Sequence, residues 1–269
     1  TERVLVAPAA RVKEAAPGRY VGALESIKHV DIVPRVTGNL LKINFTEGNL
    51  VRKGDLQYEL EDTTYQAAVD SLIAQKEALE ASLRFATREY KRNESLIRSN
   101  AVSHSAYDKA VLEIDAARAN IKKIEASLTD ARNTLSYTRI YAPLDGRIGK
   151  STYTEGNLLT PSTGKLTDIE MLSPIYVRFS LSERVFRRDF GGSEGIQKNA
   201  VVRVQLADGS IYNEAAKVTL VDNKINVSTN TITLWATFEN KDRKLIPGGF
   251  VTVLLSVRAA KSYVAVLPS

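Results

Sequence analysis

Hydrophobic residues follow two different spacings in different segments of this chain, and the two spacings predict two kinds of secondary structure. In residues 30–62, 137–169 and 170–258, apolar residues come in short alternating runs separated by glycines and other turn signals, which is typical of β-strands. Between Tyr65 and Leu135, apolar residues recur instead at steps of three and four, which is the period of a coiled coil. The sequence therefore predicts β-modules interrupted by one long helical segment.

The helical segment, residues 63–136, consists of two arms with a break at residues 99–102. Neither arm contains Gly or Pro and the connection is short, so we expect an antiparallel hairpin roughly 50 Å long, rather than two helices packed on a globular body. Lys76 and Asn93 are polar seam residues, expected to define the register at some cost in stability. The predicted seam is Val69, Leu72, Lys76, Leu79, Leu83, Ala86, Tyr90, Asn93 and Ile97, then Tyr107, Ala110, Ile114, Ala117, Ile121, Ile124, Leu128, Ala131 and Leu135.

A repeat with an offset of 108 residues flanks the two arms. The segment Phe45-Thr46-Glu47-Gly48-Asn49-Leu50 returns as Tyr153-Thr154-Glu155-Gly156-Asn157-Leu158, and Gly38 returns as Gly146. Self-similarity at a constant offset indicates two copies of one supersecondary unit. We therefore expect two halves of one small β-fold, held apart in sequence by the hairpin. Such an arrangement is typical of a scaffold that spans a distance and not of a protein with a catalytic pocket.

The C-terminal part of the chain predicts a second β-module. About six short strands with turn signals between them point to a small barrel or sandwich, and all of residues 170–258 is expected to be β. Another short strand begins near Lys261. No partner for it lies nearby in sequence. Residues 1–29 alternate loosely and predict one or two strands, so we expect the strand near Lys261 to pair with the N-terminal one.

Composition narrows the possible functions. The net charge of +6 is spread without a basic run, which excludes a nucleic-acid partner. The longest apolar run, Val251 to Leu255, is too short to cross a bilayer. No signal peptide is visible, so an exported protein would be present here in a mature or truncated form. The absence of cysteine excludes disulfides, thiolate metal sites and cysteine nucleophiles.

No group of residues forms a recognisable active site, metal site or cofactor site. His29 and His104 are far apart in sequence, and neither has a partner at metal-ligand spacing. Ser103, His104, Ser105 and Asp108 are residue types found in hydrolases. They stand at a predicted helix start, however, where an N-capping Ser is the ordinary explanation. We therefore expect a protein that is not an enzyme.

The two half-motifs, Ile32–Gly38 and Ala142–Ile148, resemble the split biotinyl/lipoyl domain of periplasmic adaptor proteins. These proteins, the HlyD-like membrane fusion proteins, belong to tripartite efflux pumps. Further matches are Ser173–Val177, Val221–Asn223 and Leu245–Val251. The resemblance covers essentially the whole chain and is closest to adaptors of resistance-nodulation-division (RND) transporters.

The resemblance implies an elongated protein of mixed α and β class with four modules. These are a partial membrane-proximal domain (1–15 and 259–269), a β-barrel (16–29 and 170–258), a lipoyl-like domain (30–62 and 137–169) and an inserted α-helical coiled-coil hairpin (63–136). In true lipoyl carriers, a lysine stands at the turn that joins the two halves. The helices occupy that turn here, so no attached cofactor is expected.

The sharpest match lies at the predicted hairpin tip. Adaptors of this family dock on a TolC-type outer-membrane duct through an Arg-Leu-Ser signature, which corresponds here to Arg92, Leu96 and Ser103. Arg92 and Leu96 share a helix face because they are four residues apart. The alternatives are a solvated Arg, a surface Leu and an N-capping Ser. Leu96, however, falls at a position flanking the seam.

By this resemblance, the protein is expected in the periplasm, attached to the inner membrane by an anchor outside this sequence. It would link a proton-driven RND transporter to a TolC-type duct and assemble as a ring of six subunits, for export of drugs or other small amphiphiles. The alternatives are an adaptor for an ABC-type exporter and, from a different class, a biotinyl or lipoyl carrier protein.

Overall fold

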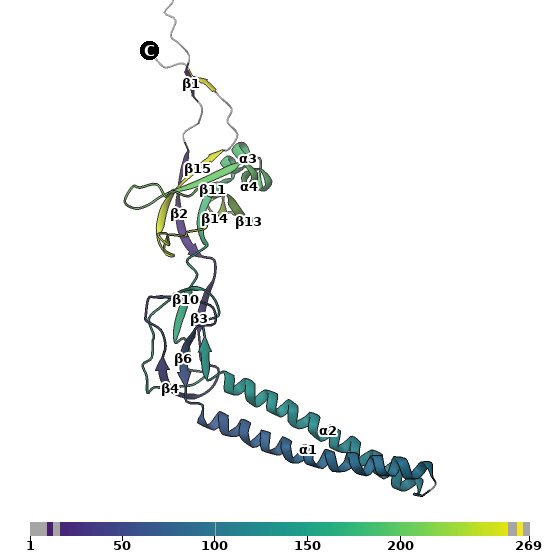
Figure 1. The fold of residues 1–269 in the computed structure, drawn as a ribbon. Coiled ribbons are helices and arrows are strands. Elements are labelled where there is room, and N and C mark those ends of the chain that lie inside the picture. The colour runs from purple at the N-terminus through teal and green to yellow at the C-terminus, as the bar shows by residue number, and fades with distance from the viewer. Residues whose placement is uncertain (1–9, 13–16, 100, 258–262, 266–269) are drawn as a thin grey trace, which may run out of the picture. The chain divides into compact units, whose positions relative to one another are not determined.

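The computed structural model describes residues 10–12, 17–99, 101–257 and 263–265 (Figure 1). The chain divides into two compact units. One consists of Thr1–Val30, Leu144–Ile148 and Ile169–Ser269, and the other of Asp31–Pro143 and Gly149–Asp168. None of the helices in the described ranges has the length and apolar character that a membrane span needs.

The first unit is built on a six-stranded antiparallel sheet, in the order β12-β15-β2-β11-β14-β13. Its inward side chains alternate with outward ones along each central strand, as the sequence pattern predicts, and Val177, Leu234, Phe238 and Val253 are fully buried. Burial of this alternating face is what stabilises the sheet. The strands are β2 (Gly18–Ser26), β11 (Ile175–Ser182), β12 (Ala200–Gln205), β13 (Val218–Asn226), β14 (Thr231–Phe238) and β15 (Phe250–Val257).

Two short helices, α3 (Glu183–Phe190) and α4 (Ser193–Asn199), follow β11 in the chain and precede β12, and Figure 1 shows them beside the strands of this sheet. The expectation that all of residues 170–258 is β was therefore wrong. Ser182 caps α3 by accepting a hydrogen bond from the Val185 backbone N–H, and Gly191 ends it with a left-handed φ of 70°. Because Phe186 and Phe190 are four residues apart, both reach the core from one face. Helices as short as α3 and α4 cannot be distinguished from strands when only the hydrophobic content of the segment is considered.

The first and last strands in the described part of the chain form a two-stranded antiparallel pair. Strand β1 (Ala10–Val12) pairs with β16 (Tyr263–Ala265), and Ala10 lies opposite Ala265. The expected pairing of the two chain ends is thus confirmed. The other residues of the predicted membrane-proximal segments, 1–15 and 259–269, lie outside the described residues.

The two copies of the repeat form two four-stranded sheets of equivalent topology, β3-β10-β8-β5 and β7-β6-β4-β9. Because Gly38 and Gly146 begin β4 and β8, the 108-residue offset maps β4 onto β8, and it likewise maps β5 onto β9. Each copy of the repeat thus contributes strands to both sheets. The strands are β3 (His29–Ile32), β4 (Gly38–Ile43), β5 (Leu50–Val51), β6 (Leu56–Leu60), β7 (Arg139–Tyr141), β8 (Gly146–Ile148), β9 (Leu158–Leu159) and β10 (Thr167–Glu170).

Reciprocal hydrogen bonds tie the two copies together. Glu47 Oε1 accepts from the Ser151 backbone N–H at 2.9 Å, and Glu155 Oε1 accepts from the Ile43 backbone N–H at 3.0 Å. Ile43 and Ser151 are themselves equivalent positions of the repeat, so the two bonds are related by its symmetry. Each glutamate thereby satisfies a backbone donor of the other copy.

Replacing either glutamate with Ala should destabilise this β-module by about 0.5–1 kcal/mol, because one hydrogen bond to a backbone N–H is lost. Symmetry predicts similar losses for Glu47→Ala and Glu155→Ala, measured by urea unfolding. Glu47→Gln and Glu155→Gln are the matched controls, since the amide keeps an acceptor oxygen. A loss at only one of the two positions would contradict the reciprocal arrangement.

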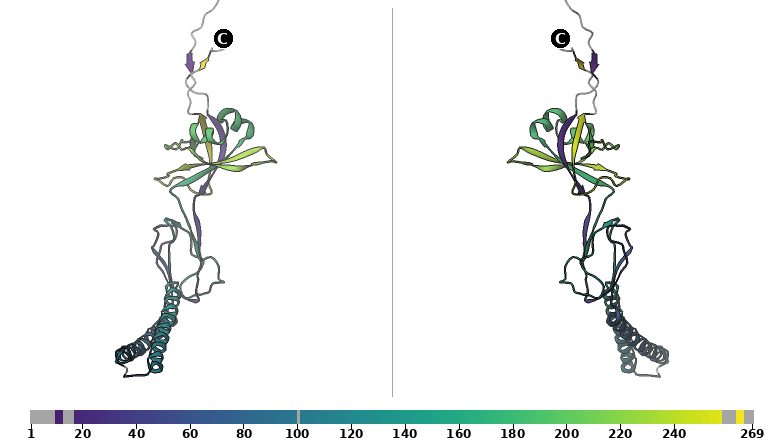
Figure 2. Two further views of the ribbon diagram at one scale, coloured as in Figure 1. Left: turned by 90° about the vertical axis from the view of Figure 1, so that its right-hand side faces the viewer. Right: turned by 90° about the vertical axis from the view of Figure 1, so that its left-hand side faces the viewer.

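The helices α1 (Thr63–Arg98) and α2 (His104–Ser136) belong to the second unit and run side by side in opposite directions (Figures 1 and 2). Every predicted seam position is buried or half-buried, as expected for facing stripes of apolar residues. The most deeply buried members of the seam are Val69, Ala86, Ala110, Ile114, Ile124 and Leu128.

The two polar seam residues behave differently. Lys76 Nζ reaches across to Glu125 Oε1 on α2 at 2.9 Å, and this hydrogen bond raises the Lys76 pKa above its usual value. Lys76 therefore links the two helices, and its expected effect on their register stays a prediction. Asn93 instead donates to the Glu89 carbonyl of its own helix at 2.9 Å. Its amide thus binds within α1, and this bond does not contribute to the register between the helices.

Candidate partner-binding site at the hairpin tip

The turn between the helices is held by the backbone of Leu96. Its carbonyl oxygen accepts hydrogen bonds from the backbone N–H of Ser99 at 3.2 Å and of Ala101 at 2.9 Å, and from Ser99 Oγ at 2.9 Å. Carbonyls at a helix C-terminus lack intrahelical partners, and these donors satisfy this one. The backbone of Leu96 is therefore part of the turn, while its half-buried side chain is partly accessible.

Arg92 projects from α1 near the tip, with 64% of its side chain exposed. Its guanidinium forms an ion pair with Glu89, one turn earlier on the same helix. This partner was missed in the sequence analysis, although its spacing of three residues signals such a pair. The contact uses one guanidinium nitrogen, and the five N–H donors of an arginine leave others for a partner.

Ser103 stands at the start of α2, on the other side of the turn. Its Oγ accepts a hydrogen bond from the Ala106 backbone N–H at 3.2 Å, and its φ of −77° and ψ of 153° are extended. The expectation of an N-capping serine is thus confirmed. The structure brings Arg92, Leu96 and Ser103 to the same end of the hairpin. Within the described residues, however, these side chains form no hydrogen bond or ion pair with one another.

The hydrolase residue types near the tip do not form a catalytic arrangement in the part of the chain described. His104 is the first residue of α2 and is exposed, and neither it nor Asp108 is hydrogen-bonded to Ser103. The Ser103 hydroxyl oxygen instead caps the N-terminus of α2. A nucleophilic serine would need a base within hydrogen-bond reach, so the geometry favours the cap.

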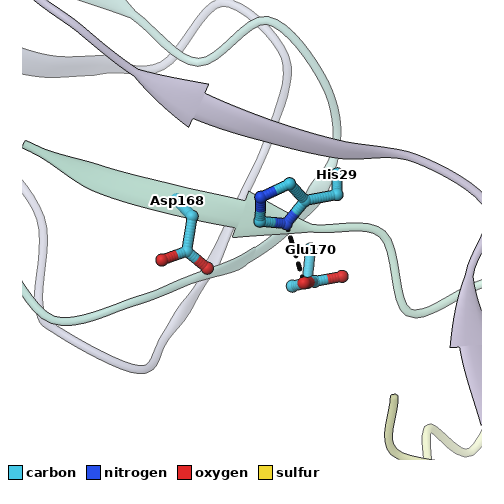
Figure 3. Close-up of side chains that lie close together, drawn as sticks. All are labelled: His29, Asp168 and Glu170. Carbon is cyan, nitrogen blue, oxygen red and sulfur yellow. Dashed lines mark hydrogen bonds and ion pairs between the residues drawn. The ribbon is translucent and has the colours of Figure 1, made fainter. Parts of the chain in front are cut away.

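A second group of titratable side chains lies near the start of β3. His29 Nδ1 is 2.8 Å from Glu170 Oε1, although 141 residues separate them (Figure 3). Asp168, two residues before Glu170 on β10, forms an ion pair with Lys165 at 2.9 Å. Sequence spacing could not reveal the histidine pair, because strand pairing brings it together. Histidine and carboxylate side chains are common metal ligands. Here, however, one possible ligand atom of each of His29, Asp168 and Glu170 already takes part in these hydrogen-bond and ion-pair contacts.

Comparison with known protein families gives two matches, which together span most of the chain. The profile of the RND MFP barrel-sandwich hybrid domain matches residues 28–169. The profile of the RND MFP beta-barrel domain matches residues 174–259.

Two curated relatives come from Escherichia coli strain K12. The multidrug export protein AcrE is 34% identical over 246 residues, which cover 89% of this chain and 63% of AcrE. The multidrug efflux pump subunit AcrA is 31% identical over 240 residues, which cover 87% of this chain and 60% of AcrA. The chain thus spans less than two thirds of the length of these relatives.

Among solved structures, MacA from Actinobacillus actinomycetemcomitans aligns with a TM-score of 0.64 and 23% sequence identity. The alignment covers 94% of this chain and 82% of MacA. At this level of identity, the similarity is one of fold, and it supports the combination of β-modules and helices described above.

Proposed function

Because this chain belongs to the family of RND membrane fusion proteins, we propose that it is the periplasmic adaptor of a tripartite efflux pump. It links an inner-membrane, proton-driven RND transporter to a TolC-type outer-membrane duct. Drugs or other small amphiphiles pass through the assembly. The chain itself performs no reaction, and the energy comes from the transporter.

The observation that carries this proposal is the long two-helix hairpin inserted between the halves of a β-module. Its helices contain 36 and 33 residues and share a shielded seam, which fits an antiparallel coiled coil. At 1.5 Å per residue, such a hairpin reaches roughly 50 Å. That reach suits a spacer between two partners, and the exposed residues at its end suit a docking contact.

The parts of the chain have separate roles in this proposal. The hairpin, residues 63–136, meets the duct through Arg92, Leu96 and Ser103, and the lipoyl-like halves support it. The β-barrel and the membrane-proximal segments contact the transporter. Six copies surround a central conduit, held at the inner membrane by an anchor outside this sequence.

The direct test is removal of the gene and complementation in the native host. Loss of the protein should raise intracellular accumulation of a fluorescent pump substrate, and the complete protein should restore efflux. Both a transporter and an outer-membrane duct should co-purify with it after cross-linking. Normal efflux in the deletion strain, together with absence of both partners, would refute the adaptor role.

We also expect that no lysine of this chain carries biotin or lipoate. The turn that would present such a lysine is replaced by the helices, which begin at Thr63 and end at Ser136. Intact mass spectrometry of protein from its native host should show the unmodified mass. A biotinyl or lipoyl shift mapped to Lys53 or Lys150 would favour a carrier function instead.

A further inference from the structure

Two large apolar side chains of the hairpin lie outside its seam and remain exposed. Phe85 on α1 is 56% exposed and Leu112 on α2 is 71% exposed. In the heptads defined by the seam, both occupy outer positions, away from the facing helix. Single exposed apolar residues are common on protein surfaces, so their meaning depends on their placement and their neighbours.

Phe85 and Leu112 lie at the same level along the hairpin. The register is given by Tyr90 and Tyr107, whose ring centroids are 5.9 Å apart across the seam. Tyr90 is five residues after Phe85, and Tyr107 is five residues before Leu112. Since the helices are antiparallel, equal steps from this pair lead to equal heights. The hairpin therefore presents one apolar side chain on each helix at one height.

Among the charged residues one turn from these two side chains, the two that form no ion pair within the described residues carry opposite charges. Arg88 lies one turn from Phe85 toward the tip, and Asp108 lies one turn from Leu112 toward the tip. Both are exposed, and neither forms an ion pair within the described part of the chain. A surface with Phe85 and Arg88 on α1 is thus matched, at the same height, by a surface with Leu112 and Asp108 on α2.

We propose that these two surfaces bind each other in neighbouring copies of this chain. Phe85 of one copy packs on Leu112 of the next, and Arg88 of the first pairs with Asp108 of the second. The inference rests on the proposed function, which includes a ring, and it assigns residues to the contact between hairpins. Two different patches on the two outer sides of one hairpin make a heterologous interface, and such an interface generates a ring when the rotation between neighbouring copies closes.

A second copy is the occupant that these observations favour. An unrelated partner would need to complement only one patch, whereas here the two patches complement each other in apolar character, charge and height. Matched opposite charges also select the register of association. Rotation about the ring axis does not change the height of a residue along that axis. If the hairpins run nearly parallel to the axis, Phe85 of one copy therefore lies at the height of Leu112 of the next, as this contact requires.

Cysteine cross-linking in the complete protein in its native envelope gives a direct test, because residues 1–269 contain no cysteine of their own. Phe85→Cys and Leu112→Cys are expressed together in one chain and oxidised. We expect disulfide-linked oligomers of this chain, about tenfold more abundant than with Phe85→Cys and Ala119→Cys, because a disulfide needs Cα atoms within about 7 Å. Ala119 is exposed on the same face of α2, two turns further from the tip.

The single variants distinguish the geometry of the interface. Phe85→Cys alone should give little linked dimer, since Phe85 faces Leu112 of the neighbour and not another Phe85. Efficient dimers from either single variant would indicate a two-fold contact and overturn the proposal. Equal linkage with Leu112→Cys and Ala119→Cys, or linkage of the double variant to a different protein, would also overturn it.

Charge reversal provides an independent readout. Arg88→Asp and Asp108→Arg should each lower the yield of the Phe85–Leu112 cross-link several-fold, and the two together should restore it, since opposite charges again meet. If the two reversals together do not restore the cross-link, Arg88 does not pair with Asp108 and that part of the proposal is wrong. If cross-linking fails while efflux and binding of the transporter and duct are normal, this interface is wrong and the adaptor function stands.

Discussion

Arg92→Asp, Leu96→Ser and Ser103→Arg should each abolish efflux and cross-linking to the outer-membrane duct while the chain stays folded. Arg92 has free donors for charge-assisted hydrogen bonds to duct carbonyls or carboxylates, and an aspartate would reverse that charge. Leu96 has partly exposed apolar area that a partner would remove from water. Ser103 is small and exposed at the helix start, so a long arginine there would block close approach.

The chain offers matched controls for each of these effects. Lys91→Asp makes the same charge change beside Arg92 at another exposed position and should leave docking intact. Ser103→Asp keeps an N-capping oxygen, whereas Ser103→Arg loses the cap at a cost of about 1 kcal/mol. Melting curves should therefore show little change for Arg92→Asp and Leu96→Ser, because neither side chain belongs to the seam.

Drug susceptibility of the native host and site-specific cross-linking to the duct are the measurements. Full resistance in all three tip variants would show that the duct binds elsewhere on the hairpin. Loss of efflux with intact cross-linking would instead place these residues in a later step, after docking. If Lys91→Asp proves as damaging as Arg92→Asp, the effect is one of general charge and not of a specific contact.

Ile114→Ala should destabilise the hairpin by about 2–5 kcal/mol, which is the range for removing large buried side chains. Ile114 is only 3% exposed and faces α1 across the seam, so its loss leaves a cavity between the helices. Leu79→Ala and Ile121→Ala should cost less, toward the lower end of that range, because both residues are half-buried. Lys122→Ala, at an exposed position of α2, is the control with little expected effect.

Hydrogen exchange measured by mass spectrometry would locate this destabilisation. Protection should fall in α1 and α2 but not in the six-stranded sheet, since these elements belong to different compact units and local opening follows such units. Equal loss of protection in the hairpin and in β11 or β14 would show that the units unfold together.

The seam of the hairpin and the halves of the repeat could be predicted from the sequence alone. A heptad pattern is local, because each residue's position follows from its neighbours three and four residues away. Every predicted seam position is indeed shielded. The N-cap at Ser103 was predicted for the same reason, since its hydrogen bond reaches only to Ala106. The candidate site at the tip followed from a family resemblance, and the structure shows where its residues lie.

Tertiary structure decided the contacts that depend on strand register or side-chain rotamers. The exchange of hydrogen bonds by Glu47 and Glu155 and the pairing of His29 with Glu170 join residues more than a hundred positions apart. No local period specifies such pairs, because the choice of strand partner determines which side chains meet. Asn93 illustrates the same limit at short range. Its place in the seam followed from the heptad, but its amide binds the Glu89 carbonyl because that acceptor lies within reach on its own helix.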